Sequence, residues 1–299
     1  MLSTPILTTA FLALVASISA APSPDPNLAS APLVQVKTYT PSQLAPFLGK
    51  TNPGHSINAS LAARELESSQ EDHLAKRSGV IGADNRVLWT SKDYPYSAIG
   101  RISFSSGWKC TGVLVGSRHV ATARSCIPLS DTWGARFAPS YYDGERLGGS
   151  NVVAAVMLPF FSFPPCGYKD DFAILVLADQ IGYERGWFGS KEIYCPGQKN
   201  SNGWFHMGYP SDKDNGNRPY RQEAIKLLSC DTCAPGGPLE TDADVTGPYG
   251  QPGGPLWLLE NGERFVYGVA TDWNTPGRNY FASGPDFLGA IGAARRDYP

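Results

Sequence analysis

Residues 110–126 read CTGVLVGSRHVATARSC, and the pattern of this stretch decides the fold class. Two short apolar runs lie on either side of the turn residues GSR, as expected for paired β-strands. Comparable runs recur from Val80 onwards, separated by Gly, Pro, Asn and Asp: SAIGRISF, NVVAAVML, DFAILVLA, WFHMGYP, EAIKLL, PLWLLE and RFVYGVATDW. The pattern predicts an all-β sandwich or barrel, and the closing sequence PDFLGAIGAARRDYP predicts a short terminal helix.

The composition narrows the possible functions. The chain has 299 residues, of which 42% are hydrophobic and 17% are charged, which is enough apolar material for a sizeable core. Lys and Arg number 25 against 27 Asp and Glu, so we expect no nucleic-acid partner, because neutralising phosphates needs a basic surplus. The 32 glycines and 25 prolines favour a turn-rich β protein, and the composition excludes a collagen, a coiled coil and a polytopic membrane protein. We expect a monomer without a membrane partner.

The first residues indicate secretion. Residues 5–20 read PILTTAFLALVASISA, an uncharged apolar run that is too short for a spanning helix and ends in small residues. We interpret residues 1–20 as a signal peptide. A secreted chain folds under oxidising conditions, so we expect disulfides at all six cysteines. These are Cys110, Cys126, Cys166, Cys195, Cys230 and Cys233.

Residues 21–77 differ in amino-acid composition from the rest of the chain and are interpreted as a propeptide. They begin with the Pro-rich sequence APSPDPNLASAP and end with LAARELESSQEDHLAKR, whose crowded charges are compatible with a short polar helix. The last two residues, Lys76 and Arg77, form a dibasic pair of the kind that secretory convertases cut. We therefore predict a largely disordered propeptide over 21–77 and a mature domain over 78–299. A glycosylation sequon begins at Asn58, within the propeptide.

Three segments in chain order carry a family resemblance. They are the stretch 110–126, the sequence DDFAILVL at 170–177 and the sequence DVTGPYGQPGGPLW at 244–257. In this order they resemble the trypsin-like serine peptidases, most nearly the secreted glutamyl-endopeptidase-like group. Segments 80–86, 94–100 and 208–213 add to the likeness. The resemblance implies two antiparallel six-stranded β-barrels, about 80–178 and 179–299, with the active site in the cleft between them.

The resemblance also assigns functional positions, and two of them carry unusual residues. Asp171 stands at the triad aspartate, Ser125 stands where the family has its general-base histidine, and Pro252 stands where it has the nucleophilic serine. Gly250 matches an oxyanion-hole position. A serine hydroxyl needs an imidazole to take its proton, and proline offers neither a nucleophilic atom nor a backbone N–H. We therefore predict no peptide hydrolysis by the usual mechanism, and expect Asp171 to accept hydrogen bonds from the Ser125 hydroxyl or from nearby backbone N–H groups.

No other histidine is expected to replace the missing base. His55 and His73 fall in the predicted propeptide, and His119 and His206 read as strand residues bonded to backbone partners. The second GGP, in the sequence CAPGGP at 233–238, has no serine at the matching place and reads as a turn. Glutamate-specific members of the family carry a histidine in a Gly-x-His strand. The matching sequence here, GVATDW at 268–273, has none and contains Asp272, which would repel a substrate carboxylate.

The cysteine pairing is only partly implied. The resemblance pairs Cys110 with Cys126. The remaining four allow three pairings, of which we favour Cys166–Cys195 with Cys230–Cys233. The CxxC at 230–233 is also compatible with a zinc or redox site, but no further zinc ligands and no βαβ setting accompany it. The acidic pair at 170–171 supplies too few oxygens for calcium. We expect no cofactor and no metal.

Three functions remain open on the sequence. The first is a secreted pseudoprotease that binds peptides or another protease, as a binding or decoy module. In that case Trp257, Tyr249 and Trp273 are candidate walls of the cleft, although each also fits an ordinary core position. The second is an active secreted serine endopeptidase with a non-standard site. The third is a structural scaffold that keeps the barrels for their stability alone.

Overall fold

A computed structural model describes most of the chain from residue 80 onwards and two stretches before it. The described residues are 28, 32–47, 50–57, 80–130, 132–159, 166–233, 236–245 and 250–299. Several sequence predictions fall outside these residues: the signal peptide, the polar helix over 60–76, Asn58 and the pair Lys76-Arg77. Near the start of the predicted propeptide, only Leu28 is described. Among the described residues, no helix is both long and apolar enough to cross a membrane.

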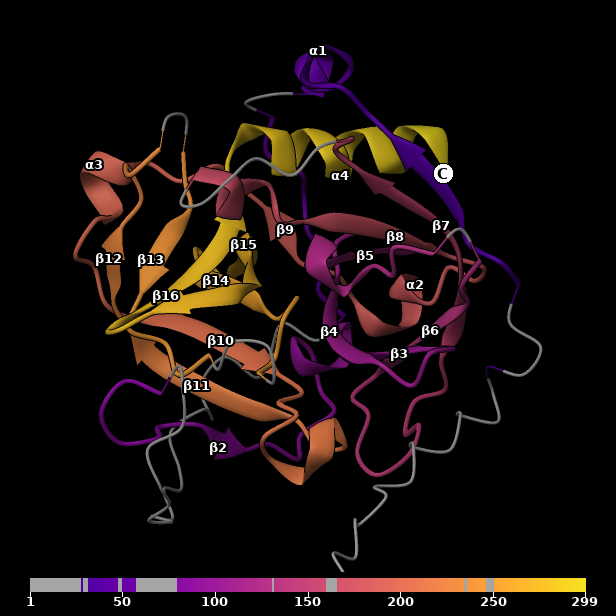
Figure 1. Cartoon of the computed structure of the whole chain (residues 1–299), viewed down its shortest axis with the longest axis horizontal. Helices are drawn as coiled ribbons and strands as arrows, with labels where there is room; N and C mark the ends of the chain where they lie inside the picture. Colours follow the sequence, from indigo (N-terminus) through magenta and orange to yellow (C-terminus); the bar gives the residue numbers. More distant parts are fainter. Residues whose placement is uncertain are drawn as a thin grey trace, which may run out of the picture.

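The first half of the domain is a closed antiparallel barrel (Figure 1). Its strands are β3 (Ile99–Phe104), β4 (Lys109–Leu114), β5 (His119–Thr122), β6 (Ala135–Pro139), β7 (Ser150–Met157) and β8 (Ala173–Leu177). They are ordered β7-β6-β3-β4-β5-β8, and pairing of β8 with β7 closes the ring. The alternating runs of the sequence fill its interior with fully buried side chains such as Ile102, Val113 and Phe137. The all-β prediction is confirmed.

The second half is a half-barrel. Its strands are β10 (Trp204–Gly208), β11 (Tyr220–Ile225), β12 (Leu227–Ser229), β13 (Leu239–Thr241), β14 (Pro255–Glu260), β15 (Glu263–Thr275) and β16 (Arg278–Ser283). They follow the order β12-β13-β16-β15-β14-β10-β11, with β9 (Gly189–Ser190) added to β15. The free edge of β11 pairs with β2 (Val87–Leu88) instead of with β12, so this sheet stays open. A full second barrel was expected, and the pairing with β2 explains the difference.

The chain closes with the predicted helix, α4 (Pro285–Asp297), which begins at a proline in its first turn. Its buried residues include Phe287, Leu288 and Ile291, which join the core of the first barrel. In Figure 1 this helix runs along one side of the molecule, beside the first strand and helix of the chain. Two short α-helical turns also lie in the domain, α2 (Gly182–Arg185) and α3 (Cys195–Gln198).

Part of the predicted propeptide, which the sequence analysis expects to be largely disordered, is folded onto the domain. Strand β1 (Gln35–Thr38) pairs in parallel with β7, and helix α1 (Pro41–Leu44) with the turn η2 (Ala45–Phe47) lies against α4. Asn52 and His55 form isolated bridges with residues of the domain. The expectation rested on the Pro-rich and charged ends of the segment. Between them lie apolar residues that become buried, Val34, Tyr39 and Leu44.

Candidate functional site

Ser125 lies just beyond the end of strand β5, in the turn η5 (Arg124–Cys126). The next residue, Cys126, is bonded to Cys110 on β4, so the pairing implied by the resemblance is confirmed. This disulfide and the pairing of β5 with both β4 and β8 fix the backbone that carries Ser125. The side chain of Ser125 is exposed, which leaves open space in front of it.

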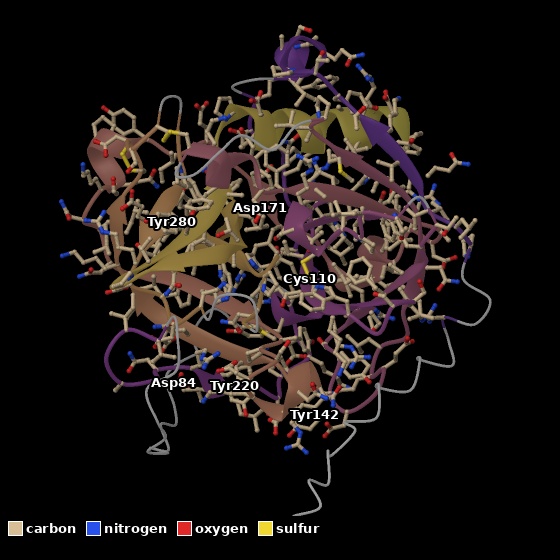
Figure 2. The ribbon with its side chains drawn as sticks, viewed as in Figure 1. Asp84, Cys110, Tyr142, Asp171, Tyr220 and Tyr280 are labelled. Atoms are coloured by element: carbon tan, nitrogen blue, oxygen red, sulfur yellow. A yellow bond between two sulfur atoms is a disulfide. The ribbon has the colours of Figure 1, made fainter. Side chains whose placement is uncertain are left out.

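Asp171, which is labelled in Figure 2, is fully buried and contacts Ser125. Its carboxylate accepts the Ser125 backbone N–H at 2.7 Å through one oxygen and the Ser125 hydroxyl at 3.0 Å through the other. A buried carboxylate without donors would be costly, and these two bonds supply them. The prediction for Asp171 is therefore confirmed on both counts, hydroxyl and backbone.

A further charge stands near this pair. Burial lowers the pKa of Arg124, an effect that the charges of Asp171 and Asp170 oppose. Asp170 also accepts a 2.5 Å ion-pair bond from its neighbour Lys169. Arg124 is therefore a cation close enough to interact electrostatically with both carboxylates.

Pro252 lies in a loop that is fastened to both sheets. Its carbonyl accepts from the Thr111 N–H on β4 at 2.9 Å, and the next residue, Gly253, donates to the Ala270 carbonyl on β15 at 2.8 Å. Gly253 has a φ of +83°, and a Cβ there would overlap the Thr111 carbonyl and the Thr122 hydroxyl. Only glycine fits both constraints. The loop is therefore packed against the end of β5, three residues before Ser125.

The structure thus brings the three predicted positions, Ser125, Asp171 and Pro252, together where the two sheets meet. This place is called the seam below. Ser125 and Asp171 touch directly, and Pro252 reaches the same strand end through Thr111 and Gly253. Gly250 lies at the start of the loop and is held by its carbonyl, which accepts from the Ser211 N–H at 3.1 Å. Residues 246–249, including Tyr249, lie outside the described residues.

His206 stands directly behind this loop. A Cβ at Gly254 would lie 2.5 Å from its ring, and its Nδ1 donates to the Pro255 carbonyl at 2.9 Å. The other ring nitrogen, Nε2, is buried and has no hydrogen-bond partner among the described residues. Burial lowers the pKa of His206 to about 4, so the ring is neutral at neutral pH. His206 is a core residue with a backbone partner, as predicted.

His119 lies on β5 but faces away from the site, toward the end of α4. Its Nε2 is 3.2 Å from the Ala294 carbonyl and 3.0 Å from the Tyr298 carbonyl. Burial, together with the nearby charge of Arg295, lowers the pKa of His119 to about 4. The prediction of a strand histidine bonded to the backbone is confirmed here as well.

Two buried polar residues near the loop were missed by the sequence analysis. Gln251 is fully buried, and neither end of its amide has a hydrogen-bond partner among the described residues. Asp244 accepts the backbone N–H groups of Ile81 at 2.9 Å and Asn85 at 2.8 Å, which ties the start of the predicted mature domain to the segment leading into the loop. Burial raises the pKa of Asp244, and those two N–H groups oppose the rise. The only signal in the sequence was an acidic residue at the start of the third family segment.

The remaining candidates divide between core, turn and undescribed positions. Trp257 is only 2% exposed and packs between Phe188 and Phe205, so it belongs to the core. The second GGP forms a turn, as predicted, with hydrogen bonds joining Cys233 and Gly237 in both directions. The side chains of Asp272 and Trp273 are outside the described part of the molecule. Within that part, no three His, Cys, Asp or Glu residues come together as a metal site.

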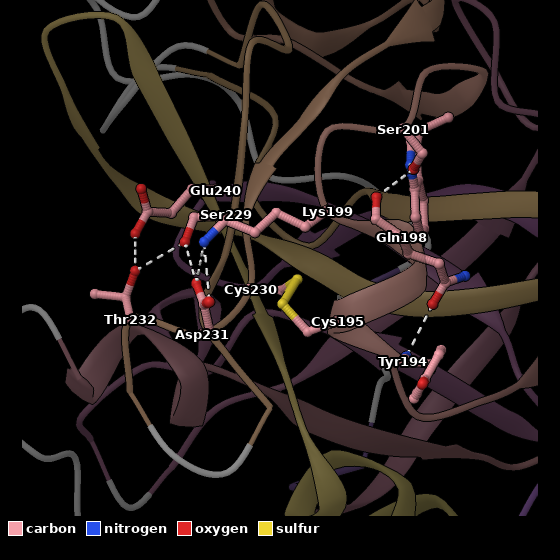
Figure 3. The surroundings of a disulfide bond; sticks show 11 residues. Tyr194, Cys195, Gln198, Lys199, Ser201, Ser229, Cys230, Asp231, Thr232 and Glu240 are labelled. Atoms are coloured by element: carbon pink, nitrogen blue, oxygen red, sulfur yellow. Dashed lines mark hydrogen bonds and ion pairs between the residues drawn. A yellow bond between two sulfur atoms is a disulfide. The ribbon is translucent and has the colours of Figure 1, made fainter.

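The other two disulfides differ from the favoured pairing. Cys166 is bonded to Cys233, and Cys195 is bonded to Cys230 (Figure 3). The two cysteines of the CxxC therefore point to different elements, one to the turn η6 (Cys166–Asp170) and one to the start of α3. Around Cys230 the turn is held by its own polar contacts, including the ion pair between Lys199 and Asp231 at 2.8 Å. Because both cysteines are bonded to partners outside the CxxC, no bridge forms within it.

Comparisons with known proteins identify similar sequences and similar folds. The family model described as Trypsin matches residues 88–283. A glutamyl endopeptidase of Bacillus licheniformis is 30% identical over 210 residues, which is 66% of this chain and 65% of that protein. A solved Glu endopeptidase structure in complex with MPD superposes with a TM-score of 0.60 at 20% identity, covering 73% of this chain and 99% of the other. The structure of human heparin binding protein gives a TM-score of 0.53 at 17% identity, covering 72% and 97%.

Proposed function

The chain belongs to the trypsin family of serine peptidases, and from that premise we propose that it is a secreted pseudoprotease that binds peptides or another protease without cutting them. The contact between Ser125 and Asp171 carries this proposal. In the family, the residue that bonds this aspartate is the general base. Here that residue is a serine, and its hydroxyl cannot take a proton near neutral pH.

The loop residue Pro252 supports the same proposal. At the nucleophile position, proline has no hydroxyl to attack a carbonyl and no N–H to bind an oxyanion. In a well-studied peptidase, loss of the nucleophile or of the base alone lowers turnover by about 10⁶. Loss of one oxyanion donor lowers it by about 10²–10³. Both losses would act together in this chain.

The histidines of the domain offer no substitute. The free nitrogen of His206 is enclosed in the core behind the loop, and a general base must reach the proton that it abstracts. His119 is bonded to backbone carbonyls at the end of α4, away from Asp171. An active peptidase with a non-standard site is therefore the weaker alternative, and no contact in the described residues favours it.

Secretion is the setting that the covalent structure supports. Three disulfides and no free cysteine among the described residues fit an oxidising compartment. Together with the predicted signal peptide over 1–20, they support an extracellular protein. A purely structural scaffold would share this setting, so only a binding measurement separates it from the binding module.

Activity is tested first with casein and with a fluorophosphonate probe that labels reactive serines, with the glutamyl endopeptidase of Bacillus licheniformis as positive control. We expect neither cleavage nor labelling of this chain. The double variant Ser125→His, Pro252→Ser restores a base, a nucleophile and an N–H, and each single variant is the matched control. Labelling of the unaltered chain would overturn the proposal.

Binding is tested with the same two classes of partner. The purified chain is immobilised, and casein peptides and the active glutamyl endopeptidase are passed over it in separate runs. Saturable binding of either partner, reduced in a variant with a bulky residue at the seam such as Ser125→Trp, supports the binding module. Absence of binding to both, with the fold intact by circular dichroism, favours the structural scaffold.

A further inference from the structure

We propose that the folded part of the predicted propeptide stays bound to the domain after the chain is cut at Lys76-Arg77. This part, residues 32–47 and 50–57, is called the strap below. The secreted protein would then consist of two chain segments held together without a covalent link, because no cysteine precedes Cys110. The inference rests on the predicted processing site and is independent of whether the domain hydrolyses peptides.

Strand β1 of the strap covers an edge that the first barrel leaves unpaired. The first two residues of β7, Ser150 and Asn151, pair with β6, whereas residues 154–157 pair with β8 on one side only. Residues 35–38 of β1 form a parallel ladder along the other side of 154–157. Removing the strap would leave the backbone groups on this other side of 154–157 without protein partners. The strap therefore covers an open edge of the closed barrel.

Helix α1 and the turn after it form the second contact. Leu44 is fully buried, and Phe47 packs so closely on α4 that a Cβ at Gly292 would lie 2.9 Å from its ring. The guanidinium of Arg296 lies 4.8 Å from the centre of the same ring. Burial of a leucine and contact with an aromatic ring are the kind of interactions that hold helices together in a core.

The end of α4 also makes polar contacts with the strap. Asp297 accepts a hydrogen bond from Tyr39 and an ion pair from Lys37, at 2.6 Å from the lysine Nζ. Bonds from Arg296, Lys37 and Tyr39 hold the pKa of Asp297 well below its usual range. The carboxylate is thus charged at neutral pH, and its Oδ2 atom is bonded by two residues of the strap.

Residues 52–55 form the third contact, with Trp187 and with strand β9. Asn52 and Ser190 exchange backbone hydrogen bonds at 3.0 and 2.9 Å, and His55 and Trp187 do so at 2.8 and 3.0 Å. The rings of His55 and Trp187 are stacked with centroids 4.6 Å apart. The indole N–H of Trp187 also donates to the Pro53 carbonyl at 3.1 Å. The strap is therefore fixed near both of its ends.

None of these contacts depends on the peptide bond after Arg77. Cutting there separates the chains about 20 residues beyond the strap (from residue 57 to residue 77) and removes no hydrogen bond described above. Dissociation would have to expose Leu44 and leave one side of residues 154–157 of β7 unpaired, and both changes oppose release. Retention is the expected outcome.

The experiment uses the full-length secreted chain. In one arm, the folded chain is cut by a convertase specific for Lys-Arg pairs. In a parallel arm, residues 70–77 are replaced by the recognition sequence of a site-specific protease, and the folded variant is cut by that protease. After complete cutting, the products are separated by size exclusion in native buffer and in 6 M guanidinium, and identified by mass spectrometry. We expect the N-terminal fragment to elute with the domain of 299 − 77 = 222 residues in native buffer and apart from it in denaturant. Separate elution in native buffer would overturn the proposal.

A matched pair of variants tests which contacts hold the strap. Leu44→Ala removes a fully buried side chain, and Val36→Ala changes a β1 side chain that is 50% exposed. In the cut protein we expect Leu44→Ala to weaken retention by at least about 30-fold, and Val36→Ala by less than about threefold. Equal retention by the two variants would show that the α1 contact does not hold the strap as proposed.

Discussion

The hydroxyl and the backbone N–H of Ser125 both donate to the carboxylate of Asp171, at 3.0 and 2.7 Å. The two residues lie next to different strands, because Ser125 follows the end of β5 and Asp171 precedes the start of β8. Ser125 is exposed and Asp171 is fully buried, so the serine covers the carboxylate from solvent. This arrangement satisfies the aspartate without any imidazole.

The two bonds to Asp171 differ in what their loss should do. We expect Ser125→Ala to lower the free energy of unfolding by only about 0.5–1.5 kcal/mol, because the N–H remains and water can reach the freed oxygen. Asp171→Ala removes the acceptor of both the Ser125 N–H and the Ser125 hydroxyl, and a loss of about 1–3 kcal/mol is expected. Urea denaturation measures both, with the exposed Ser130→Ala as control. A larger effect of Ser125→Ala than of Asp171→Ala would contradict this account.

Gly253 and Gly262 provide a test of the loop packing. Both have a positive φ, +83° and +84°, but a Cβ at Gly253 would overlap the first barrel whereas one at Gly262 would meet nothing within 4 Å. We expect Gly262→Ala to cost about 1 kcal/mol, the penalty of the left-handed conformation alone. Gly253→Ala should cost at least about 3 kcal/mol or abolish secretion, because backbone atoms must also move. Thermal unfolding compares the two, and equal shifts would show that the loop is not packed as described.

Local patterns in the sequence predicted the core strands, and the family resemblance predicted the Ser125–Asp171 contact. The run at 99–104 became β3 and the run at 173–177 became β8, since alternation and turn residues are local signals. The contact followed from the resemblance together with the cost of burying an unpaired carboxylate. Both inferences needed only residues near each other in the chain or in the family pattern.

Contacts between segments that lie far apart in the chain could not be predicted from the sequence. Strand β1 has four exposed side chains and no alternation, and it exists because one side of residues 154–157 of β7 lacks another partner. The second barrel stays open because β2 takes the edge of β11, a pairing between segments more than 130 residues apart (Val87 with Arg221). Likewise, burial of His206 and Gln251 behind the loop depends on how the two sheets meet.

The disulfide between Cys166 and Cys233 should contribute strongly to stability. It joins residues 67 apart, so its loss frees a long loop in the unfolded chain. We expect the double variant Cys166→Ser, Cys233→Ser to lose about 2–4 kcal/mol of unfolding free energy. Peptide mapping of the unreduced protein checks the pairing directly. Recovery of a peptide containing a bridge between Cys230 and Cys233 would contradict the structure.

The two buried histidines should make the domain sensitive to acid. Each has a pKa of about 4 in the folded chain against 6.5 when unperturbed, so between these pH values the unfolded chain binds more protons. Their contribution is therefore present in full above pH 6.5 and is lost as the pH falls toward 4, by about 3 kcal/mol for each histidine. We expect His206→Leu to reduce the loss of unfolding free energy between pH 7 and pH 4 by about that amount, whatever its effect at pH 7. Leu259→Ala, at a side chain that is 40% exposed, should leave the difference unchanged. Urea unfolding at the two pH values measures it, and an undiminished acid loss in His206→Leu would show that this ring is not buried in its neutral form.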